Sequence, residues 1–192
     1  MTETIRAATT ADLAPVAGVL ARAFAEYPWT RWALPEDDYA RRLVGVQRLY
    51  LGHALKHGIV LVDDQIHAVA AFLPPGCPPP EEATQRQVAE LHGSRMAALA
   101  QAQTPAAPAG AWTLETLGVD PDCQGQGLGS AVVAAGLALI DGRGEPVALE
   151  TSDERNVRLY QRLGFDTHAT TEIQSGLVVW SMSRSPGSVT VG

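Results

Sequence analysis

The chain has 192 residues, enough for one domain that buries roughly 70% of the surface of its unfolded chain. Its 14 basic and 21 acidic residues give a net charge of −7 with no basic run, so we expect no nucleic-acid partner. The N-terminus lacks the apolar segment of a signal peptide, and no uncharged apolar run reaches about 18 residues, so we expect a cytoplasmic protein with no membrane partner.

The first part of the chain predicts one strand and two helices. Residues 5–9 are typical of a strand. Residues 12–24 have apolar side chains at helical spacing, and the sequence Thr-Ala-Asp at 10–12 is expected to cap this helix. Residues 36–56 predict a second helix with acidic residues in its first turn, where they face unpaired N–H groups.

Between these helices, a predicted loop at residues 27–35 holds three aromatic side chains: Tyr27, Trp29 and Trp32. Such a cluster can line a pocket for an aromatic or amphipathic ligand, or it can fix the loop onto the core. Aromatic residues serve as anchors in both settings, so the residues alone leave both readings open.

The next segment predicts a hairpin and a third helix. Residues 59–73 are typical of a hairpin that turns at 63–65, and the proline-rich stretch 74–80 is a stiff connector. A helix is predicted over 81–103, and a Pro/Ala-rich loop at 104–110 leads to the centre of the chain.

Three alternate glycines follow the next predicted strand. Residues 112–119 contain β-branched, aromatic and other apolar side chains, a composition that predicts a largely buried strand. Gly125, Gly127 and Gly129 then open a predicted helix over 130–140. Because a helix N-terminus carries unpaired N–H groups and a partial positive charge, this stretch predicts a phosphate or pyrophosphate site. A glycine-rich turn without ligand is the alternative.

Two nucleotide-binding motifs can be compared with this stretch. An ATP-binding Walker loop needs a Gly-Lys pair, and no lysine is present here. The dinucleotide fingerprint is nearly met by Gly125, Gly127 and Ser130, with Glu150 about 20 residues further on. Only 63 residues follow Gly129, too few for the rest of a doubly wound sheet, so an NAD-binding oxidoreductase is the weaker alternative.

The last part of the chain predicts a strand at 146–151, a helix at 154–163, and a hairpin of strands at 165–173 and 177–182. No pair of histidines at i, i+4 carries the carboxylate of a zinc motif, so we expect no metal cofactor. The histidines are His53, His57, His67, His92 and His168.

Two motifs together resemble the GNAT superfamily of acetyl-CoA-dependent N-acetyltransferases. The first is Gln124-x-x-Gly127-x-Gly129 after a strand and an Asp-Pro turn, and the second is residues 156–165. The resemblance implies an α/β (α+β) fold whose mixed, mainly antiparallel sheet of about seven strands is splayed at a central parallel pair. We expect a single acetyltransferase domain over residues 1–184 and a flexible C-terminal tail over 185–192.

The resemblance also implies acetyl-CoA as the cofactor, bound between the splayed strands. Backbone groups of the central strand would bond the pantetheine arm, the glycine loop would bind the pyrophosphate, and the last helix would add one amide side chain. The cofactor-binding residues would be Leu117, Gly118, Val119, Gln124, Gly125, Gln126, Gly127, Leu128, Gly129, Ser130 and Asn156.

Two catalytic residues are expected. By resemblance, Tyr160 would lie near the cofactor sulfur, and a tyrosine stays protonated at neutral pH and can donate to a departing thiolate. An ammonium acceptor needs a base, and Glu115 stands two residues from Leu117, hence on the same face of the central strand. Glu150 is the competing candidate, and it would otherwise bind the acceptor.

Within the superfamily, several runs resemble the puromycin N-acetyltransferases, among them residues 23–28, 117–122 and 149–152. The implied reaction is direct acetyl transfer, through a ternary complex, to a primary amine of a small molecule: puromycin or a related aminonucleoside or amino-acid-like amine, of the antibiotic-resistance type. Tyr27, Trp29 and Trp32 would then bind the acceptor.

Other functions stay open. A protein or peptide N-acetyltransferase would need an open acceptor groove, which the aromatic loop argues against. A non-catalytic acyl-CoA sensor would bind the cofactor without turnover. The protein is expected to be a monomer or a homodimer.

Overall fold

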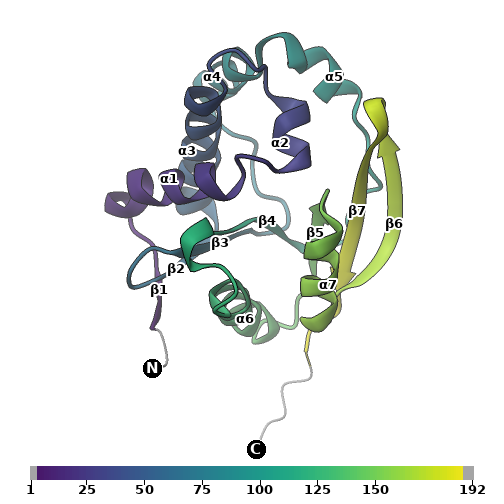
Figure 1. The fold of residues 1–192 in the computed structure, drawn as a ribbon. Coiled ribbons are helices and arrows are strands. Elements are labelled where there is room, and N and C mark those ends of the chain that lie inside the picture. Colours follow the sequence, from purple (N-terminus) through teal and green to yellow (C-terminus); the bar gives the residue numbers. More distant parts are fainter. Residues whose placement is uncertain (1–3, 188–192) are drawn as a thin grey trace, which may run out of the picture.

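A central sheet of seven strands with helices on both faces forms the fold in the computed structural model, which describes residues 4–187 (Figure 1). The end of the expected tail, residues 188–192, lies outside the described residues. The strands follow the order β1-β2-β3-β4-β5-β7-β6. Their bounds are β1 (Ile5–Ala7), β2 (Ile59–Asp63), β3 (Ala68–Leu73), β4 (Trp112–Val119), β5 (Val147–Thr151), β6 (Asp166–Ile173) and β7 (Leu177–Arg184).

Neighbouring strands are antiparallel except for β4 and β5, which run parallel. The predicted mixed, mainly antiparallel sheet is therefore confirmed, and its topology is that of the GNAT fold. A doubly wound dinucleotide-binding sheet is mostly parallel. The sheet thus does not fit the alternative in which the glycines bind NAD.

Helices cover both faces of the sheet because β3 is apolar on both sides. Phe72 of β3 packs into the cluster with α6, whereas Val69 and Ala71 pack into the cluster with α1 and α3. Figure 1 shows α6 beneath the sheet and the other helices, apart from α7, above it. The helices are α1 (Leu13–Ala23), α2 (Pro28–Ala33), α3 (Tyr39–His57), α4 (Glu82–His92), α5 (Met96–Gln101), α6 (Leu128–Asp141) and α7 (Glu154–Arg162).

The predicted aromatic loop contains a short helix, α2. Pro28 occupies its first position, where the missing N–H costs nothing. Thr30 Oγ1 donates to the carbonyl of Phe24 at 2.6 Å and so joins α2 to the end of α1. The next helix, α3, begins at Tyr39, later than predicted, because Asp38 before it has a left-handed φ of 57°.

The single helix predicted over 81–103 is wrong. Gly93 has a φ of +49°, so α4 ends at His92 and α5 begins only at Met96, after a 3-10 turn. The final strand extends beyond its predicted end to Arg184, whose guanidinium forms a bidentate pair with Asp141 of α6 at 3.0 and 3.1 Å.

The central parallel pair is closed at one end only. β4 and β5 pair through Trp112 with Val147 and through Thr113 with Ala148, and then they diverge. The predicted splay is therefore confirmed. Past this point, the side of β4 that faces β5 has no strand partner.

A β-bulge in β4 changes the direction of Glu115. Phe72 of β3 pairs with Leu114 and Ala71 pairs with Thr116, so Glu115 is the extra residue. The bulge interrupts the alternation along the strand, so the spacing of two residues does not by itself place Glu115 and Leu117 on one face. Leu117 packs against the α6 cluster and also lines the cavity that Glu115, α1 and α3 line.

Close packing of α6 on β3 generates a first prediction. A Cβ added to Gly136 of α6 would lie 2.2 Å from Cε2 of Phe72, which is fully buried. In Gly136→Ala, overpacking costs ~1–3 kcal/mol or more, which outweighs a gain in helix propensity of ~1 kcal/mol. We expect urea unfolding to give a lower free energy of unfolding.

Gly52→Ala in α3 is the matched control. A Cβ there would meet nothing within 4 Å, so we expect only the propensity gain of up to ~1 kcal/mol. Equal effects of the two substitutions would contradict the packing described for Gly136.

Candidate active site

A cavity of about 670 Å³ lies where β4 and β5 diverge. Helices α1 to α5 supply one part of its wall, and β4, β5, α7 and the β6–β7 hairpin supply the other. The cavity therefore spans both halves of the sheet. Its position beyond the carboxyl ends of two parallel strands is where ligands bind in open sheets.

Seven of the predicted site residues are among those that line this cavity. They are Tyr27, Trp29, Glu115, Leu117, Glu150, Asn156 and Tyr160. Trp32 is not among them; its ring lies against that of Trp29, with the ring centroids 5.2 Å apart. The glycine loop follows β4, and a Cβ on Gly129 would lie 3.1 Å from Cγ2 of Val119.

The glycine loop presents unpaired amides at the start of α6. Gly125 and Gly127 have φ values of +78° and +86°, a conformation that glycine adopts without strain. Within residues 4–187, no acceptor takes a hydrogen bond from the backbone N–H groups of Gln124 to Ser130. Consecutive unpaired N–H groups at a helix N-terminus are what a phosphate requires, so this loop fits a pyrophosphate.

The backbone of β4 is also available beside the cavity. Asp120 N donates to His67 O at 2.7 Å, so the backbone groups of Asp120 face β3. Alternate residues of a strand direct their backbone groups to opposite sides, so those of Leu117 and Val119 face the gap toward β5. Gln124 Nε2 donates to Val119 O at 3.3 Å, but the backbone groups of Leu117 remain open to a ligand that adds as a strand.

Tyr160 is held in the wall by α7. Asp153 caps this helix by accepting from Arg155 N at 2.8 Å, and the Tyr160 ring packs edge-on against Phe165 at 5.8 Å between centroids. Burial and, to a smaller extent, Tyr27 raise the pKa of Tyr160 above that of an ordinary tyrosine. Its hydroxyl therefore stays protonated at neutral pH and can only give a proton there.

Glu115 and Glu150 face the same cavity from β4 and β5. Water reaches Glu115 through the cavity, but the surrounding walls desolvate its carboxylate. This burial, together with the charge of Glu150, raises the pKa of Glu115. Ser181 Oγ donates to Glu150 at 3.3 Å, whereas no ion pair within the described chain involves Glu115. A carboxylate with a raised pKa and no cationic partner suits a general base.

The segment with Tyr27 and Trp29 lines the cavity and is bonded to the end of β5. The Tyr27 hydroxyl accepts from Ser152 N at 2.8 Å and lies 3.0 Å from Thr151 Oγ1, and Trp29 N donates to Ser152 Oγ at 3.1 Å. These bonds join α2 to the end of β5. The segment thus connects the N-terminal helices to the half of the sheet that contains β5.

Several polar residues of the cavity wall were not predicted from the sequence. Among them are Gln47 and Tyr50 on α3 and His92 at the end of α4. Burial and the charge of Glu115 raise the pKa of Tyr50. Gln47 falls on the buried face of α3, and a polar residue on an otherwise apolar face was the one available signal.

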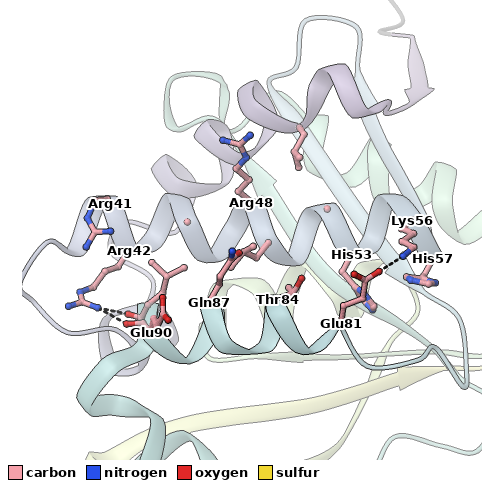
Figure 2. A pocket seen from close by; sticks show the side chains of 15 residues that line it. Arg41, Arg42, Arg48, His53, Lys56, His57, Glu81, Thr84, Gln87 and Glu90 are labelled. Atoms are coloured by element: carbon pink, nitrogen blue, oxygen red, sulfur yellow. Dashed lines mark hydrogen bonds and ion pairs between the residues drawn. The ribbon is translucent and has the colours of Figure 1, made fainter.

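A second cavity, of about 720 Å³, lies between α3 and α4 (Figure 2). Two of its cationic side chains make contacts across the groove: Lys56 Nζ lies 2.6 Å from Glu81, and Arg42 donates to the carbonyls of Glu90 and Leu91. No predicted site residue lies among the described residues that line it. The chemistry therefore points to the cavity between β4 and β5.

A family profile and two solved structures are similar to this chain. A family profile described as "Acetyltransferase (GNAT) domain" matches residues 86–167. A structure from Corynebacterium glutamicum, described as histone acetyltransferase HPA2 and related acetyltransferase, is similar over 100% of both chains, with 25% identity and a TM-score of 0.80. A GNAT family acetyltransferase from Brucella melitensis, solved with acetyl-CoA, is 20% identical over 96% of this chain and 88% of its own, with a TM-score of 0.54.

Curated relatives match over a short segment. A mycothiol acetyltransferase of Streptomyces coelicolor is 47% identical over 57 residues, which cover 28% of this chain and 18% of that protein. A mycothiol acetyltransferase of Salinispora arenicola is 53% identical over 53 residues, or 26% of this chain and 17% of its own. The chain thus spans less than a fifth of the length of these relatives.

No helix among the described residues is long and apolar enough to cross a membrane, and none of their His, Cys, Asp or Glu side chains form a group that could hold a metal ion. The shared fold and the profile match over residues 86–167 make this chain similar to the GNAT acetyltransferases.

Proposed function

We propose that this chain is an acetyl-CoA-dependent N-acetyltransferase that acts on a primary amine of a small molecule. The observation that carries the proposal is the convergence of Leu117, Glu115 and Tyr160 on one cavity, at the point where β4 and β5 diverge. Backbone groups, a base and a proton donor are thus available around one space. Residues 1–184 would act as a single domain.

The cofactor would lie along the gap and the glycine loop. The unpaired amides of Gln124 to Ser130 would bind its pyrophosphate, and the backbone of Leu117 would bond the pantetheine arm, with Val119 and Gly118 beside it. Asn156, on α7, would add a side-chain hydrogen bond. The acetyl-CoA bound to the Brucella melitensis protein, which shares the fold, supports this assignment.

The reaction needs three proton transfers. Acetyl-CoA supplies a thioester carbonyl that an amine can attack. The Glu115 carboxylate would take one proton from the acceptor ammonium, directly or through water, so that the nitrogen lone pair becomes free. The backbone N–H of Leu117 would polarise the carbonyl oxygen. The Tyr160 hydroxyl would give its proton to the departing sulfur as the C–S bond breaks, and the second proton that the nitrogen loses as the amide forms would restore the Tyr160 hydroxyl.

The acceptor end of the cavity favours a small molecule. Met96, Leu99 and Pro105 line it from α5 and the following loop, and Trp29 lines it from α2. These walls leave less room for a protein or peptide chain than an open groove would. The runs at residues 23–28, 117–122 and 149–152 support puromycin or a related aminonucleoside or amino-acid-like amine, and a role in antibiotic resistance.

Mycothiol acetyltransferases share a short segment with this chain, and an acceptor related to theirs is a second candidate. A sensor that binds acetyl-CoA without turnover is the alternative from another class. A cytoplasmic location and a monomeric or homodimeric state remain predictions.

Release of thiol from acetyl-CoA across an amine panel tests the proposal. The panel would contain puromycin, aminoglycosides, polyamines, free amino acids, the acceptor of the mycothiol acetyltransferases and a lysine peptide. We expect saturable turnover with at least one small amine and none with the lysine peptide. Tight binding of acetyl-CoA without turnover of any amine would favour the sensor.

The pH dependence of Glu115→Gln tests the base. Because the carboxyl pKa is raised in the folded protein, its contribution to stability is present below the ordinary pKa and is lost as pH rises through the raised pKa. The glutamine variant should therefore be more stable than wild type at neutral pH, and this advantage should disappear in acid. It should also lose the rise in kcat/KM with pH.

Denaturation and initial rates measured across pH would check both effects, with Glu172→Gln on the exposed face of β6 as the control. An unchanged rate profile in Glu115→Gln would remove Glu115 from the mechanism and leave Glu150→Gln as the variant to measure.

Two glycine substitutions test the cofactor loop. Gly127 and Gly144 have φ values of +86° and +72°, and an added Cβ would meet nothing within 4 Å at either position. Alanine should cost each about 1–2 kcal/mol of stability. Only Gly127→Ala should also weaken acetyl-CoA binding, by roughly tenfold or more, because it distorts the anion-binding loop.

Calorimetric titration of acetyl-CoA into both variants would measure this difference. Equal affinities in Gly127→Ala and Gly144→Ala would place the pyrophosphate elsewhere.

A further inference from the structure

Two carboxylates, Glu115 and Glu150, line the cavity, and no lysine or arginine is among its described lining residues. The other titratable groups of the wall include His92 and His168. A carboxylate or phosphate on the acceptor would thus enter next to two acids with no lysine or arginine to offset its charge. If the proposed acetyl transfer takes place here, the cavity selects against amines that carry such a group.

Gln47 supplies an unused amide in the same wall. Its side chain is 9% exposed, lines the cavity from α3, and has no hydrogen-bond partner within residues 4–187. Every fully enclosed side-chain nitrogen or oxygen of the described residues has a partner, so the amide must be reached from the cavity. A largely buried amide without a partner costs stability unless a ligand uses it.

His92 supplies a hydrogen-bond acceptor of fixed orientation. Its ring is 6% exposed, and Nδ1 lies 2.9 Å from the carbonyl oxygen of Ala33. Because a carbonyl only accepts, Nδ1 carries the proton. Burial lowers the pKa of His92, so the ring is neutral and Nε2 keeps its lone pair. Nε2 has no partner among the described residues, and His92 lines the cavity.

We propose that Gln47 and His92 form a polar subsite that binds a hydrogen-bond-donating group of the acceptor, and that the acceptor carries no carboxylate. The donating group is a hydroxyl or a second ammonium, located away from the amine that is acetylated. Nε2 of His92 and the two carboxylates can only accept, and the amide of Gln47 accepts through its oxygen and donates through its Nε2. An amine with a second donor therefore matches these acceptors, whereas the carboxylate of an α-amino acid would meet two other carboxylates. This inference deepens the proposed function and depends on it.

Pairs of amines that differ by one group test the inference in the wild-type protein. Tyramine and phenethylamine differ by a hydroxyl, 1,4-diaminobutane and 1-aminobutane differ by an ammonium, and tyramine and tyrosine differ by a carboxylate. We expect the amine with the extra donor to have a KM about tenfold lower in at least one of the first two pairs, as one hydrogen bond provides. Tyrosine should be acetylated at least about tenfold less efficiently than tyramine.

Gln47→Leu tests the subsite directly. The variant should raise the KM of the donor-bearing amine about tenfold with little change in kcat, and it should leave the KM of its partner amine within about twofold. Because the amide has no partner to lose, the variant should be at least as stable as wild type. Gln87→Leu, at an exposed position of α4 in the second cavity, is the control and should change neither constant.

Other outcomes overturn the inference. Equal effects of Gln47→Leu on both amines of a pair, a loss of stability, or tyrosine as good a substrate as tyramine would each contradict it. So would failure of all five amines in an enzyme that acetylates another member of the panel. No turnover of any amine would instead contradict the proposed function itself.

Discussion

The divergence of β4 and β5 after two residue pairs is the constraint on which the rest of the structure depends. A parallel pair that stayed closed would satisfy its backbone groups internally and leave no space between the strands. Because the pair opens, the backbone of Leu117 faces a gap, and the N-terminus of α6 lies at the end of the same strand. The gap, the free amides and the cavity are therefore consequences of a single break in the sheet.

An open sheet needs other contacts to hold its halves together, and both ends of the parallel pair have them. At the closed end, Arg184 of β7 pairs with Asp141 of α6, which packs mainly on the other half of the sheet. At the open end, Tyr27 and Trp29 form hydrogen bonds to Thr151 and Ser152 at the end of β5. Tyr27 and Trp29 therefore both line the cavity and join the two halves of the sheet.

Local signals predicted the parts of the site that depend on nearby residues. The strand at 112–119 was placed at its observed bounds because its apolar run ends at a proline turn, and α7 was found within one residue because Asp153 caps it and a glycine follows. The glycine loop was recognised because positive φ angles and unpaired amides require glycine at particular positions.

Features that depend on distant partners were not predicted. The bulge at Glu115 is a shift in the pairing of β4 with β3, so the sequence of β4 alone does not predict it. The break at Gly93 looked like an ordinary helical glycine, and Trp32 could not be separated from Trp29 without knowing which face α2 turns to the cavity. Gln47 is a polar residue on the buried face of α3, but only the structure shows that no neighbouring residue within 4–187 forms a hydrogen bond with its side chain.

Hydrogen–deuterium exchange with and without acetyl-CoA tests the central claim most directly, because it reports where the cofactor binds. The account predicts slower exchange at the amides of residues 117–119 and 124–130, with no change along α3 and α4 around the second cavity. Protection confined to α3 and α4, with unchanged exchange in the glycine loop, would contradict the claim that the gap between β4 and β5 is the cofactor site.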